Sequence, residues 1–192
     1  MKLIHYNNTL QIKEPSVVTV GSFDGVHLGH QALLQQVKDY AQQNLYQSVI
    51  VTFNPHPQEV LKNKPDFFLI NTFEQKITLF EKLGMDTVLV IPFSSEFSQK
   101  SANQFFKEYI FSTINLKAIF LGPNHHFGKQ RKGDADTLSR ICQKNRIELF
   151  KTQEFTVTNL PVRSTLIRQY LAQKDFQNAE KLMGHHCYTL SI

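Results

Sequence analysis

One ten-residue segment, Gly21–His30, combines three glycines with two histidines. The histidines, His27 and His30, are three residues apart, so on a helix they share a face and can hydrogen-bond the same phosphate oxygens. Glycine has no Cβ, which lets the backbone turn sharply and come close to a ligand. The glycines are Gly21, Gly25 and Gly29. These residue types at this spacing predict a phosphate-binding site.

The elements on either side would place this segment at the start of a helix. Val17–Val20 is an apolar run typical of a buried strand, and Gln31–Gln43 carries apolar residues at helical spacing. A helix N-terminus offers free N–H groups and the positive end of the helix dipole, which suit an anion. We expect the ring of His30, in the first helical turn, to project into a crevice rather than into the core, so that its removal would leave no cavity.

Two other interpretations of the histidines remain open. They could bind a metal with Asp24 as third ligand, although the further well-spaced ligand that zinc sites usually recruit is not evident. They could also merely cap the helix, but capping does not explain three glycines and two histidines together. The common phosphate loops, G-x-x-x-x-G-K-[ST] and G-x-G-x-x-G, are absent from the sequence.

The order of residues in this segment adds a resemblance. His27-Leu-Gly-His30 resembles the H-x-G-H motif of the α/β-phosphodiester nucleotidyltransferase superfamily, and all of Gly21–His30 resembles the motif of the FAD synthetase (FMN adenylyltransferase) family. The resemblance implies that His27 and His30 are catalytic and hold ATP phosphates, and we expect Asp24 to orient the loop through the loop's backbone N–H groups. The ATP-binding residues that it implies here are Gly21, Ser22, Phe23, Asp24, His27, Gly29 and His30.

A second segment follows the predicted strand Ser48–Phe53. Pro55, His56 and Pro57 come after Thr52-Phe53 as in the family's T-F-x-P-H-P segment, and the resemblance implies that these three residues form the flavin side of the site. Rigid prolines hold an apolar wall without entropy loss, which suits a flat aromatic ligand. The alternative is a strand-ending turn with a surface histidine.

A third segment, Gly122–Gly133, resembles the family's G-x-[DN]-x-x-F-G-x-x-R-x-G sequence. The resemblance implies FMN contacts from Asn124, Phe127 and Arg131, with Phe105 as a neighbour. Asn124 stands at a position that is often Asp in the family, where an amide can still hydrogen-bond a ribose or a base edge. Arg131 could meet phosphate or lie in an exposed loop.

A fourth segment, Arg163–Arg168, resembles the family's S-S-T-x-I-R sequence. The resemblance implies that Ser164, Thr165 and Arg168 close over the ATP phosphates and that Arg168 is catalytic. Arg163 replaces the first serine of the family pattern, a departure that could alter loop packing or add a phosphate contact. The alternative is that Ser164 or Thr165 is a plain helix N-cap.

Strands and helices alternate along the chain, which predicts an α/β fold with a Rossmann-like, doubly wound parallel sheet. The motif segments directly follow strands, so we expect them to converge on one crevice at the carboxyl ends of the sheet. The predicted strands are 17–20, 48–53, 87–91, 117–121 and 147–150, with 155–158 as a short edge strand. The predicted helices are 31–43, 72–83, one after Ser101, 135–145, one from Ser164, and one from Asp175 to Met183.

Length and composition suit one globular domain, residues 1–192, with 41% hydrophobic and 19% charged residues. The net charge of +5 suits phosphorylated substrates, and no nucleic-acid-binding motif accompanies it. Two cysteines, a polar N-terminus and no apolar run of membrane length predict a cytoplasmic protein. The C-terminal riboflavin kinase barrel usual in bacterial members does not follow, so we expect a stand-alone adenylyltransferase or a truncated enzyme that does not phosphorylate riboflavin.

The resemblance implies adenylyl transfer from ATP to FMN, giving FAD and pyrophosphate. ATP and FMN are then the small-molecule partners, with Mg²⁺ screening the triphosphate and no metal ligand from the protein; the sequence does not indicate an oligomeric state. One alternative is another nucleotidyltransferase of the superfamily, with pantetheine phosphate, nicotinamide mononucleotide or glycerol phosphate as acceptor. Another is a flavin- or nucleotide-binding regulator without turnover.

Overall fold

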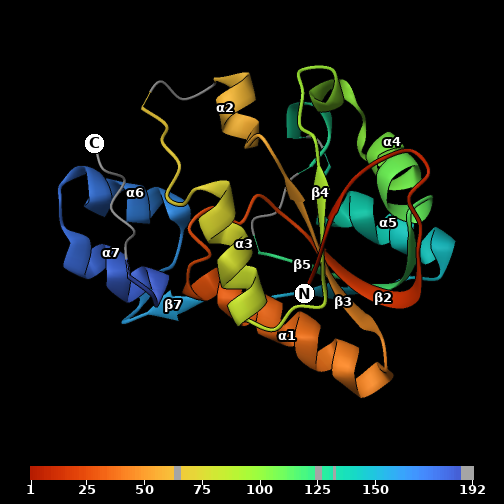
Figure 1. Cartoon of the computed structure of the whole chain (residues 1–192), viewed down its shortest axis with the longest axis horizontal. Coiled ribbons are helices and arrows are strands. Elements are labelled where there is room, and N and C mark those ends of the chain that lie inside the picture. The colour runs from red at the N-terminus through yellow and green to blue at the C-terminus, as the bar shows by residue number, and fades with distance from the viewer. Residues whose placement is uncertain (63–65, 124–126, 132, 187–192) are drawn as a thin grey trace.

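A six-stranded parallel sheet forms the centre of the computed structural model, which describes residues 1–62, 66–123, 127–131 and 133–186 (Figure 1). The strand order is β1-β4-β3-β2-β5-β6, and every neighbouring pair is parallel. The strands are β1 (Lys2–His5), β2 (Ile12–Val20), β3 (Gln47–Phe53), β4 (Thr87–Ile91), β5 (Ile114–Leu121) and β6 (Glu148–Lys151). The order reverses between β2 and β5, which is where such sheets bind ligands.

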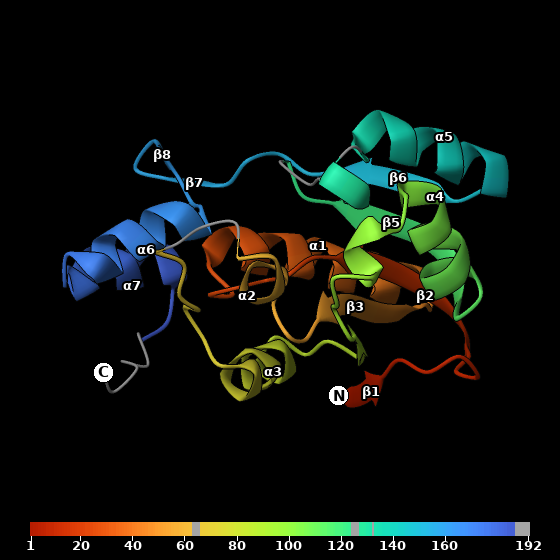
Figure 2. The same cartoon turned by 90° about the horizontal axis from the view of Figure 1, so that it is seen from above.

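Helices cover both faces of this sheet, so its central strands are apolar on both sides (Figure 2). On one face pack α1 (Leu28–Asn44) and α3 (Phe73–Lys82). On the other face pack α4 (Ala102–Phe105), which continues as a π-helical stretch (Phe106–Phe111), and α5 (Ala135–Asn145). The predicted α/β, doubly wound architecture is therefore confirmed.

Two helices form a third packing unit beside the carboxyl edge of the sheet. The helices α6 (Ser164–Ala172) and α7 (Phe176–Met183) bury an apolar cluster that includes Ile70 and Val162. Figure 1 shows them at the opposite end of the molecule from α4 and α5. As predicted, Asp175 caps α7 through its side chain. The N-terminus of α6 thereby lies against the loop that follows β2.

Several element boundaries differ from the sequence prediction. Strand β1 was not predicted, because it is a short edge strand whose residues are mostly exposed and show no apolar run. The segment predicted as an edge strand forms instead a separate hairpin of β7 (Thr156–Val157) and β8 (Leu160–Pro161). Helix α1 begins at Leu28 rather than Gln31, because His27 provides the cap. An unpredicted short helix, α2 (Pro57–Leu61), follows β3.

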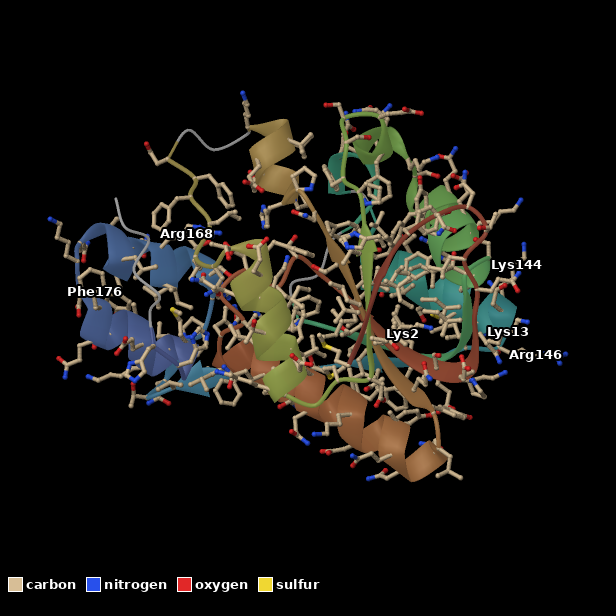
Figure 3. The ribbon with its side chains drawn as sticks, in the orientation of Figure 1. Lys2, Lys13, Lys144, Arg146, Arg168 and Phe176 are labelled. Carbon is tan, nitrogen blue, oxygen red and sulfur yellow. The ribbon has the colours of Figure 1, made fainter. Side chains whose placement is uncertain are left out.

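The remaining helical pieces are short 3₁₀ turns, Phe97–Gln99 and Lys129–Arg131. Within the residues that the structure describes, no helix combines the length and the apolar character needed to cross a membrane. The basic side chains labelled in Figure 3 are distributed over the molecule: Lys13, Lys144 and Arg146 lie toward one end, whereas Arg168 lies toward the other.

Candidate active site

A pocket of about 840 Å³ opens where the parallel strands end, a volume typical of small-molecule sites. The loops after β2, β3, β4, β5 and β6 all contribute to its lining, together with the start of α6. Every residue predicted for the ATP side lines it: Gly21, Ser22, Phe23, Asp24, His27, Gly29, His30, Ser164, Thr165 and Arg168. On the predicted FMN side, His56, Pro57, Phe105 and Phe127 line it as well. The expected convergence of the motif segments on one crevice is confirmed.

The loop after β2, residues 21–30, turns into α1 through left-handed backbone conformations. Gly25 has φ +85°, where a side chain would be strained and its Cβ would lie 3.1 Å from Ile70. Phe23 and Val26 also have positive φ, and both are buried, so the packing of their side chains holds the turn in place. Among the three glycines of the segment, only Gly25 therefore has a backbone angle that requires glycine. We call residues 21–30 the glycine loop.

The two histidines of the glycine loop form a stacked pair, with ring centroids 3.6 Å apart. The Nδ1 atom of His27 accepts the backbone N–H of His30 at 3.3 Å, so His27 does cap α1. A capping Nδ1 leaves the proton on Nε2. Burial lowers the pKa of His27 to about 4, and burial, then His27 and Lys76, lower the pKa of His30 well below its usual value. Both rings are neutral at pH 7 and can each donate one hydrogen bond.

His30 faces the pocket but is not free of the core. Phe23 meets its ring edge-on at 5.2 Å between centroids, and its Nδ1 is buried without a partner among the described residues. The expectation that its removal would leave no cavity is therefore wrong, because the ring fills space between Phe23 and His27. Capping and phosphate binding are compatible here, since capping uses Nδ1 of His27 and leaves the Nε2–H.

Asp24 is buried in the glycine loop, only 5% exposed, and is bound from two directions. Its carboxylate accepts the N–H groups of Ile70 at 3.1 Å and Asn71 at 3.5 Å, and it forms an ion pair with Arg168. Burial raises the pKa of Asp24, and Arg168 and the two N–H groups oppose that rise. The expectation that Asp24 accepts from its own loop is wrong: it ties the loop to the segment before α3.

Arg168, labelled in Figure 3, contacts the segment before α3 as well as the glycine loop. Its Nε donates to the carbonyl of Phe68 at 2.7 Å, and its guanidinium lies 4.5 Å from the centroid of the Phe67 ring. Its third partner is the carboxylate of Asp24, with which it forms an ion pair. Arg168 thus lines the pocket with its charge paired to Asp24 of the glycine loop.

The N-terminus of α6 closes the pocket from the other side. Ser164 Oγ donates to the backbone carbonyl of Asp24 at 2.9 Å, which fixes α6 to the glycine loop. The N-cap residue is Arg163, which makes no capping bond with its side chain and pairs instead with Glu154 at 2.6 Å. The first-turn N–H groups of α6, near Thr165, are thus not capped by a side chain, and helix N-termini of this kind bind anions.

Aromatic rings form the opposite wall of the pocket. Phe53, Phe93, Phe97 and Phe105 lie in mutual ring contact, with centroid distances from 5.3 to 6.3 Å, and all of them line the pocket. Phe127 packs on Phe106 at 5.3 Å. Such a wall can hold a flat ring by stacking and edge contacts.

His56 borders the aromatic wall and has a structural role as well. Its Nδ1 accepts the N–H of Gln58 at 3.1 Å and caps α2, while its ring stacks on Phe67 at 4.9 Å. Burial, followed by Lys76 and Arg168, lowers the pKa of His56 to about 4. Pro55 is exposed and lies outside the lining of this pocket. Asn124 and the side chain of Arg131 lie outside the described residues.

Sequence reasoning missed several residues of the site. Phe67, Phe93 and Phe97 line the pocket but belong to no motif, so nothing short of the fold could have identified them. Lys76 did carry a signal, because it lies one helical turn before the buried residues Leu79 and Phe80, inside the apolar stripe of α3. A lysine at such a position is seldom buried without a partner.

The metal interpretation of the histidines has no geometric support in the described part of the chain. No group of three histidine, cysteine, aspartate or glutamate side chains gathers there in a way that could hold an ion. The carboxylate that would have been the third ligand, that of Asp24, is bound to Arg168. The site is therefore built from hydrogen-bond donors, the N-termini of α1 and α6, and aromatic rings.

Comparison with known proteins identifies the same family as the motifs. The model of the FAD synthetase family matches residues 9–166. The chain is 33% identical over 186 residues to a bifunctional riboflavin kinase/FMN adenylyltransferase of Buchnera aphidicola subsp. Schizaphis graminum, covering 96% of this chain and 60% of that protein. It is 29% identical to the enzyme of the same name from Escherichia coli (strain K12), again covering 96% of this chain and 60% of the relative. The chain thus spans less than two thirds of the length of these relatives.

A solved structure shows the same fold. The crystal structure of a macrolide-efflux protein from Streptococcus pneumoniae superposes with a TM-score of 0.85 and 29% identity. The match covers 97% of this chain and 72% of that one. The sheet and its surrounding helices are therefore arranged as in a protein already solved by crystallography.

Proposed function

The chain belongs to the FAD synthetase family, and we propose that it transfers the adenylyl group of ATP to FMN, giving FAD and pyrophosphate. The observation that carries the proposal is that two unlike walls face one pocket. One wall has paired neutral histidines and two helix N-termini, which suit a polyanion, and the other has a set of aromatic rings, which suits a flavin.

The reaction needs no nucleophile from the protein. An anionic oxygen of the FMN phosphate attacks the α-phosphorus of ATP, and a new P–O bond forms. The bond between the α-phosphorus and the oxygen leading to the β-phosphorus breaks, and pyrophosphate leaves with that electron pair. Catalysis then rests on positioning two polyanions and on stabilising charge on the phosphates.

The proposed roles follow from the contacts around the pocket. His27 and His30 donate hydrogen bonds to ATP phosphates, and as neutral rings they do so without repelling one another. Ser164 and Thr165 present the N-terminus of α6 to the same phosphates. Arg168 acts through Asp24, by keeping the glycine loop in place.

Magnesium supplies charge neutralisation on the triphosphate when it is bound. The described side chains offer no cluster of three ligands for it. Phosphate oxygens of ATP and water would hold it, which is how Mg²⁺ is commonly held beside nucleotides.

The test is to incubate the purified chain with ATP, Mg²⁺ and FMN, to separate flavins by chromatography and to measure pyrophosphate. Equal amounts of FAD and pyrophosphate are expected. Parallel reactions replace FMN with pantetheine phosphate, nicotinamide mononucleotide or glycerol phosphate. Product from one of these but none from FMN would overturn the proposal, and binding of ATP and FMN without product would favour a regulator.

We further propose that the chain acts as one adenylyltransferase domain in the cytoplasm, on small molecules and without a nucleic-acid or membrane partner. Cys142 is a free, buried thiol whose pKa burial raises to about 11, so it is unreactive and fits a reducing compartment. Fractionation of cells followed by immunodetection of the chain tests this placement, and recovery with membranes would contradict it.

A further inference from the structure

A buried lysine lies directly behind the glycine loop. Lys76, in the first turns of α3, is 6% exposed, and its Nζ donates to the Ser22 carbonyl at 3.2 Å and to Thr52 Oγ1 at 3.3 Å. The ammonium also lies 5.5 Å from the centroid of the Phe73 ring. No carboxylate of the described residues forms an ion pair with it.

Such an arrangement is costly to the fold. Taking an ammonium out of water carries a desolvation penalty, and two neutral oxygen acceptors offset only part of it. Burial accordingly lowers the pKa of Lys76 to about 8, even though Asp24 and Glu59 act to raise it. A methionine would fill the same space at less cost to stability. The charge therefore calls for an explanation other than packing.

The two oxygens that Lys76 contacts belong to two segments that each continue into the lining of the pocket. The Ser22 carbonyl is part of the glycine loop, and Thr52 lies near the end of β3, just before His56 and the aromatic wall. The Thr52 hydroxyl also reaches the Ser22 carbonyl, at 3.4 Å, which closes a three-membered set of hydrogen bonds. Lys76 thus joins the phosphate side of the pocket to the ring side from behind.

A small cavity with polar and apolar lining residues adjoins the same ammonium. It measures about 20 Å³, and Asp24, Asn71 and Lys76 are among the residues that line it. Asn71 is 3% exposed, and both polar atoms of its amide lack a partner among the described residues. A cavity of this size has room for one water molecule, and it brings Lys76, Asn71 and Asp24 to one space.

We propose that Lys76 is a positioning residue for adenylyl transfer: it fixes the glycine loop against the end of β3, and its charge lies behind the loop that receives the ATP phosphates. This inference rests on the proposed function. The charged and titratable groups around the ammonium are Asp24 in the glycine loop, Glu59 in α2, His30 in α1 and His56 before α2, and Arg168 pairs with the same Asp24. The three pocket histidines are neutral at pH 7, so Lys76 supplies a positive charge that they do not.

The decisive variant is Lys76→Met, which keeps the length of the stem and removes both the charge and the donors. Its matched control is Lys38→Met, because Lys38 is partly buried and also donates to a backbone carbonyl, that of Leu83 at 3.1 Å, which lies outside the glycine loop. For Lys76→Met we expect kcat/KM for ATP to fall about tenfold to a hundredfold, because small misplacements of binding groups have effects of this size. The melting temperature should stay the same or rise. Lys38→Met should keep wild-type kinetics.

Two further measurements separate positioning from mere packing. In the wild type, kcat/KM for ATP should decline as the pH rises through about 8, where Lys76 loses its charge, and in Lys76→Met this decline should be absent. Backbone amides of residues 21–25 should exchange hydrogen faster in Lys76→Met than in the control. Wild-type kcat/KM in a folded Lys76→Met chain, or unchanged amide exchange in residues 21–25, would overturn the inference.

The inference and the proposed function can fail separately. If the wild-type chain forms no FAD, the proposed function fails, but the exchange comparison still decides whether Lys76 holds the glycine loop. If FAD forms and Lys76→Met is as active as the wild type, only the inference fails. If Lys76→Met does not fold, Lys76→Gln and the pH profile of wild-type kcat/KM test the inference instead. A flat wild-type profile from pH 7 to 10 would contradict a role for the charge.

Discussion

The two walls of the pocket are held in place by different interactions. Side chains from several elements bind the glycine loop through directed hydrogen bonds to its backbone: Lys76 binds the Ser22 carbonyl, Ser164 binds that of Asp24, and Gln31 binds that of Val26. The carbonyl of Gly25 lies 2.9 Å from Nε2 of His185, just after α7. In the described part of the chain, the rings of the aromatic wall are held mainly by packing on one another.

This difference matches what each wall has to recognise. An in-line displacement at phosphorus needs donors at fixed positions, and hydrogen bonds from four directions supply that rigidity. A flavin ring is recognised by shape and by burial of apolar surface, which tolerate small displacements. Changes on the phosphate side should therefore affect the rate strongly, and stability as well where they break a buried ion pair or remove a packed ring, whereas changes on the aromatic side should affect the affinity for one substrate.

The largest effect is expected at the pair of Asp24 and Arg168. Asp24→Asn leaves a mostly buried guanidinium without its counter-charge, and breaking such a pair costs roughly 3–5 kcal/mol. The free energy of unfolding, measured with urea, should fall by about that amount. Adding Arg168→Met to Asp24→Asn should restore part of the loss, because the unpaired charge is then gone.

The exposed pair of Lys100 and Glu108, 2.6 Å apart, provides the control for this measurement. Glu108→Gln should cost less than about 1 kcal/mol, since exposed ion pairs contribute little. A loss at Asp24 no larger than the loss at Glu108 would show that the glycine loop does not depend on its buried contacts, and the contrast between the two walls would then disappear.

The next effect concerns the stacked histidines. His30→Asn and His27→Asn each remove a donor to phosphate, and the loss of a comparable donor lowers kcat by roughly 10²–10³ in other enzymes. FAD formation by either variant should therefore be at least about a hundredfold slower. Because the rings fill space beside Phe23, we also expect a stability loss of about 1–2 kcal/mol.

A histidine outside the lining of the pocket separates the two effects. His5→Asn, on the exposed edge strand β1, should change neither the rate nor the free energy of unfolding. If both pocket variants turn over FMN nearly as fast as the wild type while their stability falls, the histidines are structural caps and the phosphate role is wrong.

The sequence predicted the phosphate side better than the aromatic side, for a physical reason. A loop that turns into a helix must carry glycine, histidine and capping residues at adjacent positions, so Gly21–His30 shows its role locally. The aromatic wall is assembled from single residues of several loops, and an isolated phenylalanine such as Phe97 looks like any core residue. The same holds for β1, whose place in the sheet depends on pairing with β4 rather than on its own residues.

Acid should destabilise the fold through the pocket histidines. Burial holds the pKa of His27 and of His56 at about 4, below the usual histidine value of roughly 6.5. As the pH falls from about 6.5 toward 4, these histidines bind more protons in the unfolded chain than in the folded chain. The free energy of unfolding therefore decreases across this window. Above pH 6.5 both states are neutral at these groups, and the contribution is constant.

One variant isolates a single titrating group in that window. His56→Asn can still cap α2, since asparagine is a good N-cap residue, but it does not titrate. The slope of the unfolding free energy against pH should become smaller by up to about 1.4 kcal/mol per pH unit, the value for one proton. An unchanged slope would mean that His56 takes up its proton equally in the folded and the unfolded chain.

The smallest effect is expected on the aromatic wall, where two phenylalanines allow a matched comparison. Phe127 and Phe111 both pack on Phe106, with centroids 5.3 and 5.8 Å away, but only Phe127 lines the pocket. Gly128, at φ +70°, would place a Cβ 2.7 Å from the backbone of Ala102, so the chain beside Phe127 is held close to α4. Phe127→Leu should raise KM for FMN about fivefold to tenfold, because an aromatic contact is worth roughly 0.5–1.5 kcal/mol.

It should leave KM for ATP unchanged, and Phe111→Leu should change neither constant while costing similar stability. Equal changes in both KM values for Phe127→Leu would show that the two walls are not independent, and the division of the pocket into a phosphate side and a ring side would be wrong.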